Sequence, residues 1–173
     1  DVRIINLETS VTTSEDFWAG KGIHYRMHPR NIPCLTAGHI DCCSLANNHT
    51  LDWGVAGLEE TLQALHKEGL QTTGAGRNVE EASMPAVINV YDKGRVIVLG
   101  LGSPTSGIPS SWAATSDRPG INLLLDLDSD SAISIGRRMF KRKQAGDVTV
   151  ASIHWGANWG YDVSKKEREF AHA

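Results

Sequence analysis

Side chains able to bind a metal ion or move a proton stand at the ends of three apolar segments. Glu8 ends the first segment, Asn48 and His49 follow the second, and His154 ends the third. A carboxylate, a carboxamide oxygen and imidazoles together suit a divalent ion such as Zn, Mn or Fe. If the three segments are strands that end at one edge of the fold, the pattern predicts an assembled metal site there.

Each of these residues, taken alone, has a simpler role. Glu8 can face solvent, and His154 can be a satisfied core histidine. Asn47 and its neighbour Asn48 can form a turn, because asparagine bonds its own backbone and tolerates the left-handed conformation. Asp52 can cap the helix that follows it as readily as it can serve a catalytic site. The joint occurrence at three strand ends favours a site over these separate roles.

The elements that must position these residues alternate between strand and helix. Apolar runs and hydrophobic periodicity predict strands at 2–8, 40–46, 71–76 and 147–154, a hairpin at 86–102, and helices at 31–38, 54–69, 129–145 and 164–173. The alternation predicts one layered α/β domain over residues 1–173. The hairpin makes a mixed sheet the expected form rather than a purely parallel one.

Local signals add detail to the helices. Asn31 is expected to cap the first helix, and Gly38 is expected to end it in the left-handed conformation. In the third helix, Ile133, Met139 and Phe140 are expected to face inward. For the last helix, a serine just before its first lysine is the expected cap.

Two long polar segments, 9–30 and 103–120, are expected to be loops. The first carries His24 and Arg26 at alternating spacing, which puts both on one face if the segment is extended. Arg26 could then bind a substrate carboxylate or phosphate, and the alternative is a solvated loop. In the second segment, Trp112 could cover the site or pack on the surface.

Composition excludes several classes of function. Hydrophobic residues make up 40% and charged residues 21% of the chain, as in ordinary globular domains. A net charge of −3 leaves no electrostatic footprint for nucleic acid. The basic run from Arg137 to Lys143 favours a solvated helix face, with phosphate or an anionic surface as the alternative. The adjacent Cys42 and Cys43 are expected to be buried free thiols on opposite strand faces.

Four segments spread along the chain resemble the bacterial capsule-synthesis, or poly-γ-glutamate synthesis, CapA family. They are NLETSVT (6–12), SLANNHTLDWGVAGLEETLQAL (44–65), GAGRNVEEASMPAV (74–87) and SIHWGANWGY (152–161). That family is similar to the calcineurin-like metallophosphoesterases. The resemblance therefore implies a layered sandwich of mixed β-sheets flanked by helices, with metal ions at the strand ends.

The resemblance also implies a role for each candidate residue. The Asn-Asn-His segment resembles the metallophosphoesterase Gly-Asn-His signature, which makes Asn48 a metal ligand and His49 the catalytic histidine beside the substrate. Glu8 falls near the ligand that bridges two metals, and His154 falls on a later histidine ligand. The residues expected to contact substrate or support these ligands are Asn47, Asp52, Arg26, His24, Trp155 and Asn158.

This sequence also departs from the family pattern. No Gly-Asp strand precedes Glu8, and no Gly-His-x-x-His segment follows His154. Asn158 stands at about the position where many members carry an acidic residue. By resemblance we expect a domain truncated at both ends, which either binds metal poorly or holds one ion where the family holds two.

The candidate residues and the resemblance are compatible with two functions. One is a metal-dependent hydrolase that uses Mn, Fe or Zn to cut a phosphoester or a related bond, such as an amide of an acidic polymer. The other is a non-catalytic subunit or polymer-binding platform of a capsule synthesis complex. An anionic polymer or phosphorylated substrate and the membrane subunits of a capsule synthase are the partners that the resemblance implies, and it places them at the bacterial cell envelope or its extracellular face.

Overall fold

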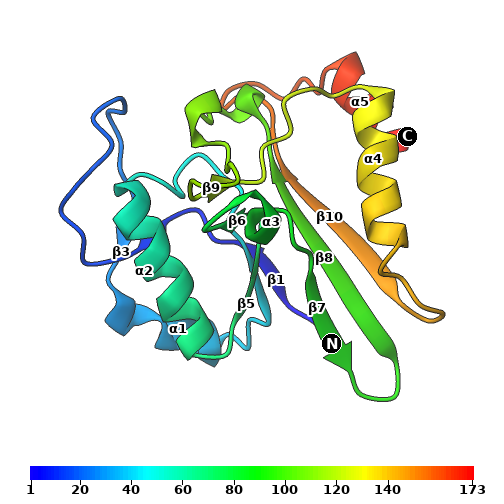
Figure 1. Ribbon diagram of the computed structural model, residues 1–173, viewed down its shortest axis with the longest axis horizontal. Helices are drawn as coiled ribbons and strands as arrows, with labels where there is room; N and C mark the ends of the chain where they lie inside the picture. The colour runs from blue at the N-terminus through cyan, green and yellow to red at the C-terminus, as the bar shows by residue number, and fades with distance from the viewer.

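Two three-stranded sheets form the centre of the computed structural model, which describes residues 1–173 (Figure 1). The elements in chain order are β1 (Ile4–Asn6), β2 (Ser10–Val11), β3 (Arg26–Met27), α1 (Pro33–Ala37), β4 (Cys42–Ser44), α2 (Gly54–Lys67), β5 (Gln71–Thr73), β6 (Ala75–Gly76), α3 (Val79–Ala82), β7 (Ala86–Val90), β8 (Gly94–Gly102), β9 (Gly120–Ile121), α4 (Ser129–Phe140), β10 (Val148–His154) and α5 (Lys165–His172). The first sheet, β1-β4-β5, is parallel. In the second, β10 is parallel and β7 antiparallel to β8, so the predicted mixed α/β fold is confirmed.

Helices cover the outer faces of the two sheets. On one side, Leu58, Leu62 and Leu65 of α2 are fully buried in a cluster that includes the first sheet. On the other side, Met139 of α4 and Phe170 of α5 pack in a cluster with β8. Figure 1 shows α2 and α4 on opposite sides of the strands. The order of layers is therefore helix, sheet, sheet, helix, and none of these helices is both long and apolar enough to span a bilayer.

The two sheets approach closely through small residues. Cys42 of β4 and Val98 of β8 belong to one buried cluster between them. Gly74, which follows β5 with a φ of +88°, lies against Gly100 of β8: a Cβ added to Gly74 would be 3.1 Å from the Gly100 Cα and 2.7 Å from the Ala46 Cβ. Glycine is thus required here both for its left-handed conformation and for the contact between sheets.

The adjacent cysteines of β4 lie on opposite faces of the strand, as predicted. Cys43 belongs to the cluster beneath α2, whereas Cys42 belongs to the cluster between the sheets. Burial raises the pKa of each thiol to about 12, and for Cys42 the neighbouring Cys43 and Asp41 add to the effect. Both side chains are therefore protonated, unreactive parts of the core.

Several local predictions are wrong. The segment 9–30 contains the parallel pair β2–β3, whose two-residue strands are too short to leave a periodic pattern. Ile32, not Asn31, is the N-cap of α1, and Gly38 has a φ of −74°. The left-handed residue after that helix is His39, with a φ of 52°. Segment 103–120 is likewise not wholly irregular, since it holds two 3-10 turns and runs into β9.

Helix α4 ends five residues before its predicted end and turns a different face inward. Ile133 is 46% and Phe140 77% exposed, whereas Met139 is buried. Ala132 and Ile135 pack with Met139 instead. These three residues are spaced by three and four positions, which forms one helical stripe, while Phe140 lies about 100° around the axis from Met139. The expected serine cap of α5 is confirmed, with a complete capping box.

Candidate functional site at the strand ends

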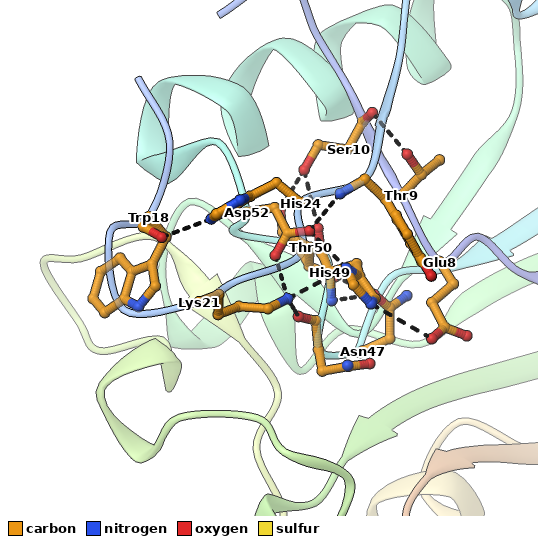
Figure 2. Close-up of polar contacts among 12 residues, drawn as sticks. Glu8, Thr9, Ser10, Trp18, Lys21, His24, Asn47, His49, Thr50 and Asp52 are labelled. Atoms are coloured by element: carbon orange, nitrogen blue, oxygen red, sulfur yellow. Dashed lines mark hydrogen bonds and ion pairs between the residues drawn. The ribbon is translucent and has the colours of Figure 1, made fainter. Parts of the chain in front are cut away.

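The ends of β1, β4 and β10 bring the principal candidate residues together at one edge of the two sheets. His154 Nε2 lies 2.9 Å from Asn48 Oδ1, so residues 106 positions apart in sequence touch across the two sheets. His49 Nε2 lies 4.0 Å from Oε1 of Glu8. Figure 2 shows Glu8 and His49 directed toward one another, with Asn47 and Asp52 beside them. The ends of the three strands thus lie close together in the structure, as the sequence predicts.

An open pocket of about 540 Å³ lies in front of this cluster. Its lining residues come from the end of the first strand, the 21–25 segment, the turn after β4 and the loop after β10. They are Glu8, Lys21, Gly22, Ile23, Tyr25, Asn48, His49, Asn158 and Trp159. The pocket is large enough for a small anionic group together with its flanking atoms.

Asn47 fixes the turn that presents its neighbours to the pocket. Its side-chain amide donates to Asn6 Oδ1 and to the Leu7 carbonyl, both at 3.0 Å. Its side-chain oxygen accepts from the His49 backbone N–H at 3.0 Å and from the Thr50 hydroxyl at 3.1 Å. This fully buried carboxamide therefore joins the end of β1 to the turn after β4, and it orients the site without facing the pocket.

His49 is held by a buried carboxylate and an aromatic ring. Its Nδ1 lies 2.6 Å from Oδ2 of Asp52, a residue with no exposed surface. The Tyr25 ring stacks on the imidazole, with centroids 3.9 Å apart and planes at 17°. These contacts assign the proton to Nδ1 and leave Nε2 facing the pocket. Asp52 is not the cap of α2, because Trp53 holds that position without a side-chain bond.

Lys21, which the sequence analysis did not select, completes this network (Figure 2). Its ammonium pairs with the second oxygen of Asp52, donates to the Asn48 carbonyl at 2.5 Å, and lies 3.3 Å from His49 Nδ1. The same ammonium lies 5.5 Å from the centroid of the Trp112 ring. A lone lysine in a glycine-rich polar segment carries no signal of its contacts with Asn48 and Asp52, which are 27 and 31 residues away in sequence.

Lys21→Ala is expected to lower the free energy of unfolding by about 2–4 kcal/mol, because it leaves the Asp52 carboxylate buried without its cationic partner. Urea denaturation of the whole protein measures the change. Lys165→Ala is the matched control, since Lys165 pairs with Glu169 on the surface at 3.4 Å and is expected to change stability by less than about 0.5 kcal/mol. Equal losses for the two variants would contradict a structural role for Lys21.

The His154 imidazole is kept neutral by its surroundings. Burial lowers its pKa below the ordinary histidine value, and the neighbouring His49 adds to this, while the Glu8 carboxylate acts in the opposite direction. A lowered pKa means that the ring is uncharged at neutral pH. A neutral imidazole is the form that can act as a metal ligand.

The donor spacing can be compared with the geometry of a divalent ion. Two ligand atoms at right angles on an octahedral ion, each roughly 2.1 Å from it, are roughly 3.0 Å apart. His154 Nε2 donates a hydrogen bond to Asn48 Oδ1 at 2.9 Å, a separation that two ligands of one ion would also have. No three His, Cys, Asp or Glu side chains form a group that could hold an ion by themselves. An ion held here by Glu8 and His154 would therefore depend on the Asn48 carboxamide.

Arg26 and His24, the two predicted substrate contacts of the 9–30 segment, form contacts outside the strand-end pocket. Arg26 donates to the Ser14 carbonyl at 2.6 Å and to Glu15 Oε1 at 2.8 Å. His24 Nε2 lies 2.7 Å from the Trp18 carbonyl oxygen. Neither side chain lines the pocket, because the 9–30 segment folds back on itself instead of running extended.

The remaining candidates divide between the pocket and the core. Asn158 lines the pocket. Trp155 packs edge-on against Phe170 in the cluster below α5, with ring centroids 5.9 Å apart. Trp112 neither covers the site nor lies on the surface, because it is 2% exposed and packs edge-on against Trp18. Its place behind Lys21 makes it a support for the network.

The fold and the site together define a class of protein. It is a layered α/β domain with a polar site at its strand ends, in which a buried carboxylate holds a central histidine. The family model of the bacterial capsule synthesis protein PGA_cap matches residues 1–173, and the chain belongs to that family. This finding confirms the CapA-type resemblance of the sequence.

Individual relatives agree with this assignment. The chain is 43% identical over 173 residues to a probable polyglutamine synthesis accessory protein of Mycobacterium tuberculosis (strain H37Rv), with 99% of this chain and 46% of that protein covered. It is 28% identical over 169 residues to the PGA biosynthesis protein CapA of Bacillus subtilis, with 97% and 42% covered. It is 27% identical over 156 residues to the capsule biosynthesis protein CapA of Bacillus anthracis, with 90% and 36% covered. The chain spans less than half the length of these curated relatives.

Proposed function

We propose that the strand-end site is that of a metal-dependent hydrolase, which cuts a phosphoester or a related bond in capsule or poly-γ-glutamate synthesis. The observation that carries the proposal is the 2.9 Å approach of Asn48 and His154 across the two sheets, beside a histidine held by a buried carboxylate. Membership of the capsule synthesis family supports the biological setting. The layering of two sheets between helices supports a metallophosphoesterase-like architecture.

Glu8, Asn48 and His154 would together hold one Mn, Fe or Zn ion. Such an ion supplies Lewis-acid activation of a water molecule and of the bond to be cut. A carboxamide oxygen contributes to the set without adding charge, and the neutral His154 ring would bind through Nε2 once the proton on that nitrogen had moved to Nδ1. Asn6 orients the Glu8 carboxylate, because its side-chain amide donates to Glu8 Oε2 at 3.1 Å.

In this proposal His49 is the residue that transfers a proton to the leaving group. Asp52 accepts from Nδ1 and so directs Nε2 into the pocket, where the ring, when protonated on both nitrogens, can donate the Nε2 proton to a leaving-group oxygen. Lys21 balances the Asp52 charge, which keeps the carboxylate from being buried without compensation. Tyr25 holds the plane of the ring by stacking. Together these contacts preorganise the imidazole for general acid catalysis.

A second function is favoured by the description of the Mycobacterium tuberculosis relative as an accessory protein. In that case the pocket binds an anionic polymer or a phosphorylated compound without cutting it, and the chain acts within a synthesis complex that includes synthase membrane subunits. Lys21, at the wall of the pocket, would contribute the positive charge for such an anion.

Loss of the histidine ligand provides the test. His154→Ala in the whole protein is expected to weaken Mn²⁺ binding by at least about 100-fold, since loss of even an outer-shell partner costs 10–100-fold. Calorimetry and elemental analysis measure binding, and turnover of an aryl phosphate measures hydrolysis. His172→Ala is the control, because that histidine is exposed at the end of α5. Unchanged Mn²⁺ affinity in His154→Ala would overturn the metal site, and metal binding without turnover would favour the accessory function.

A further inference from the structure

Helix α4 and the turn after it carry an uncompensated group of cations. The five residues, all within seven positions, are Arg137, Arg138, Lys141, Arg142 and Lys143. The ion pairs of the structure all involve other residues. Two pairs of these cations are four positions apart on or next to the helix, a spacing at which like charges destabilise. On a chain of net charge −3, this group is a strong local excess of positive charge.

Three of the cations line a hollow between α4 and the segment after α3. Arg138 crosses this gap, with its guanidinium donating to the Ser83 carbonyl at 2.7 Å. Lys141 and Arg142 line the same pocket of about 350 Å³. The one carboxylate in the lining belongs to Glu80. This group of Ser83, Arg138, Lys141 and Arg142 is called the α4 basic cleft below.

The backbone of Arg142 is held by a residue that is not part of the α4 basic cleft. The Arg142 carbonyl accepts from the Arg95 guanidinium at 3.0 Å, and Arg95 also pairs with Asp147 at 2.5 Å. Arg142 can therefore present its side chain from an anchored backbone. Burial and the charge of Arg142 both lower the pKa of Arg138, which is the expected effect of a cationic neighbour that no anion offsets.

We propose that the α4 basic cleft binds the oxyanion groups, carboxylate or phosphate, of a polyanionic chain. A pocket of this volume takes one or two such groups, while Arg137 and Lys143 lie beyond its lining and can contact further groups along a chain. A single phosphate would leave most of the positive charge unbalanced. The cleft shares no lining residue with the strand-end pocket, so the inference goes beyond the proposed function and does not depend on hydrolysis.

The test measures binding of a fluorescent γ-linked oligoglutamate to the whole protein by anisotropy. Lys141→Ala/Arg142→Ala is expected to raise the Kd roughly tenfold at low salt. Neither of these side chains forms an ion pair in the structure, so the fold is expected to be unaffected. The control is Lys165→Ala/Lys166→Ala, which removes the same charge from exposed positions of α5 and is expected to change the Kd less than about twofold. His49→Ala reports on the strand-end pocket in the same assay, and a loss of binding in that variant but not in Lys141→Ala/Arg142→Ala would place the oligoglutamate in the strand-end pocket and overturn the proposal.

Two further arms identify the source of the oxyanion and the kind of partner. Polyphosphate of matched charge replaces the oligoglutamate, and the polymer that the double variant weakens more is the chemistry that the cleft prefers. Vesicles of anionic phospholipid form the second arm. Binding to vesicles alone, or equal affinity of wild type and double variant for both polymers, would overturn the proposal. Circular dichroism of each variant confirms that a loss of binding is not a loss of fold.

Discussion

His49→Ala is expected to lower kcat for an aryl phosphate by about 10²- to 10⁴-fold, the range typical of losing a general acid or base. The metal content is expected to stay unchanged, because the proposed ligands are Glu8, Asn48 and His154. The physical reason is that Nε2 of His49 faces the pocket, while Asp52 holds Nδ1 at 2.6 Å. Steady-state kinetics with Mn²⁺ present, together with elemental analysis, measure both quantities.

A graded pair of variants separates chemistry from folding in this experiment. Asp52→Asn keeps the size of the side chain but removes the charge that orients His49, so it is expected to reduce kcat by less than His49→Ala does. His172→Ala should behave as wild type. Equal turnover in wild type and His49→Ala would rule out His49 as the proton donor even if the protein binds Mn²⁺.

Gly74→Ala is expected to destabilise the protein by about 3–4 kcal/mol, a large part of the ~5–15 kcal/mol that stabilises an ordinary domain. Two effects add. The φ of +88° strains any side chain, and the new Cβ would lie 2.7 Å from the Ala46 Cβ and, across the two sheets, 3.1 Å from the Gly100 Cα. Urea denaturation followed by circular dichroism measures the loss.

Gly69→Ala separates these two contributions. Gly69 also has a positive φ, +77°, but nothing lies within 4 Å of an added Cβ. The control is therefore expected to show only the conformational strain, about 1–2 kcal/mol. If both variants lost the same stability, the contact between the sheets would not be the reason for glycine at position 74.

The parts of the fold that follow a regular period could be predicted from the sequence. Leu58, Leu62 and Leu65 recur at helical spacing and are all buried by α2, together with Gly57 and Thr61. Strands too short to repeat their two-residue period could not be predicted, since β2 and β3 have two residues each and are defined by pairing with each other. The inward face of α4 was misjudged because Phe140 is apolar yet lies beside the buried stripe rather than in it.

In the site too, residues that follow a sequence pattern could be predicted, whereas residues placed only by tertiary contacts could not. Polar residues at strand ends predicted where Glu8, Asn48 and His154 would meet, because the order of strands in an α/β sheet brings their carboxyl ends to one edge. Arg26 was misplaced because an alternating spacing gives a common face only in an extended segment. Lys21 was missed because its role comes entirely from long-range contacts with Asp52 and the turn after β4.

The meeting of Asn48 and His154 also constrains when the strand-end site can form during folding. A contact that spans 106 residues has a high contact order, and such contacts form late because a long loop must close first. During synthesis the N-terminal ligands leave the ribosome well before β10 exists, so the nascent chain holds half a site. The strand-end site would then form only when β10 docks beside β8, which makes ligand binding at that site a reporter of the docking of β10.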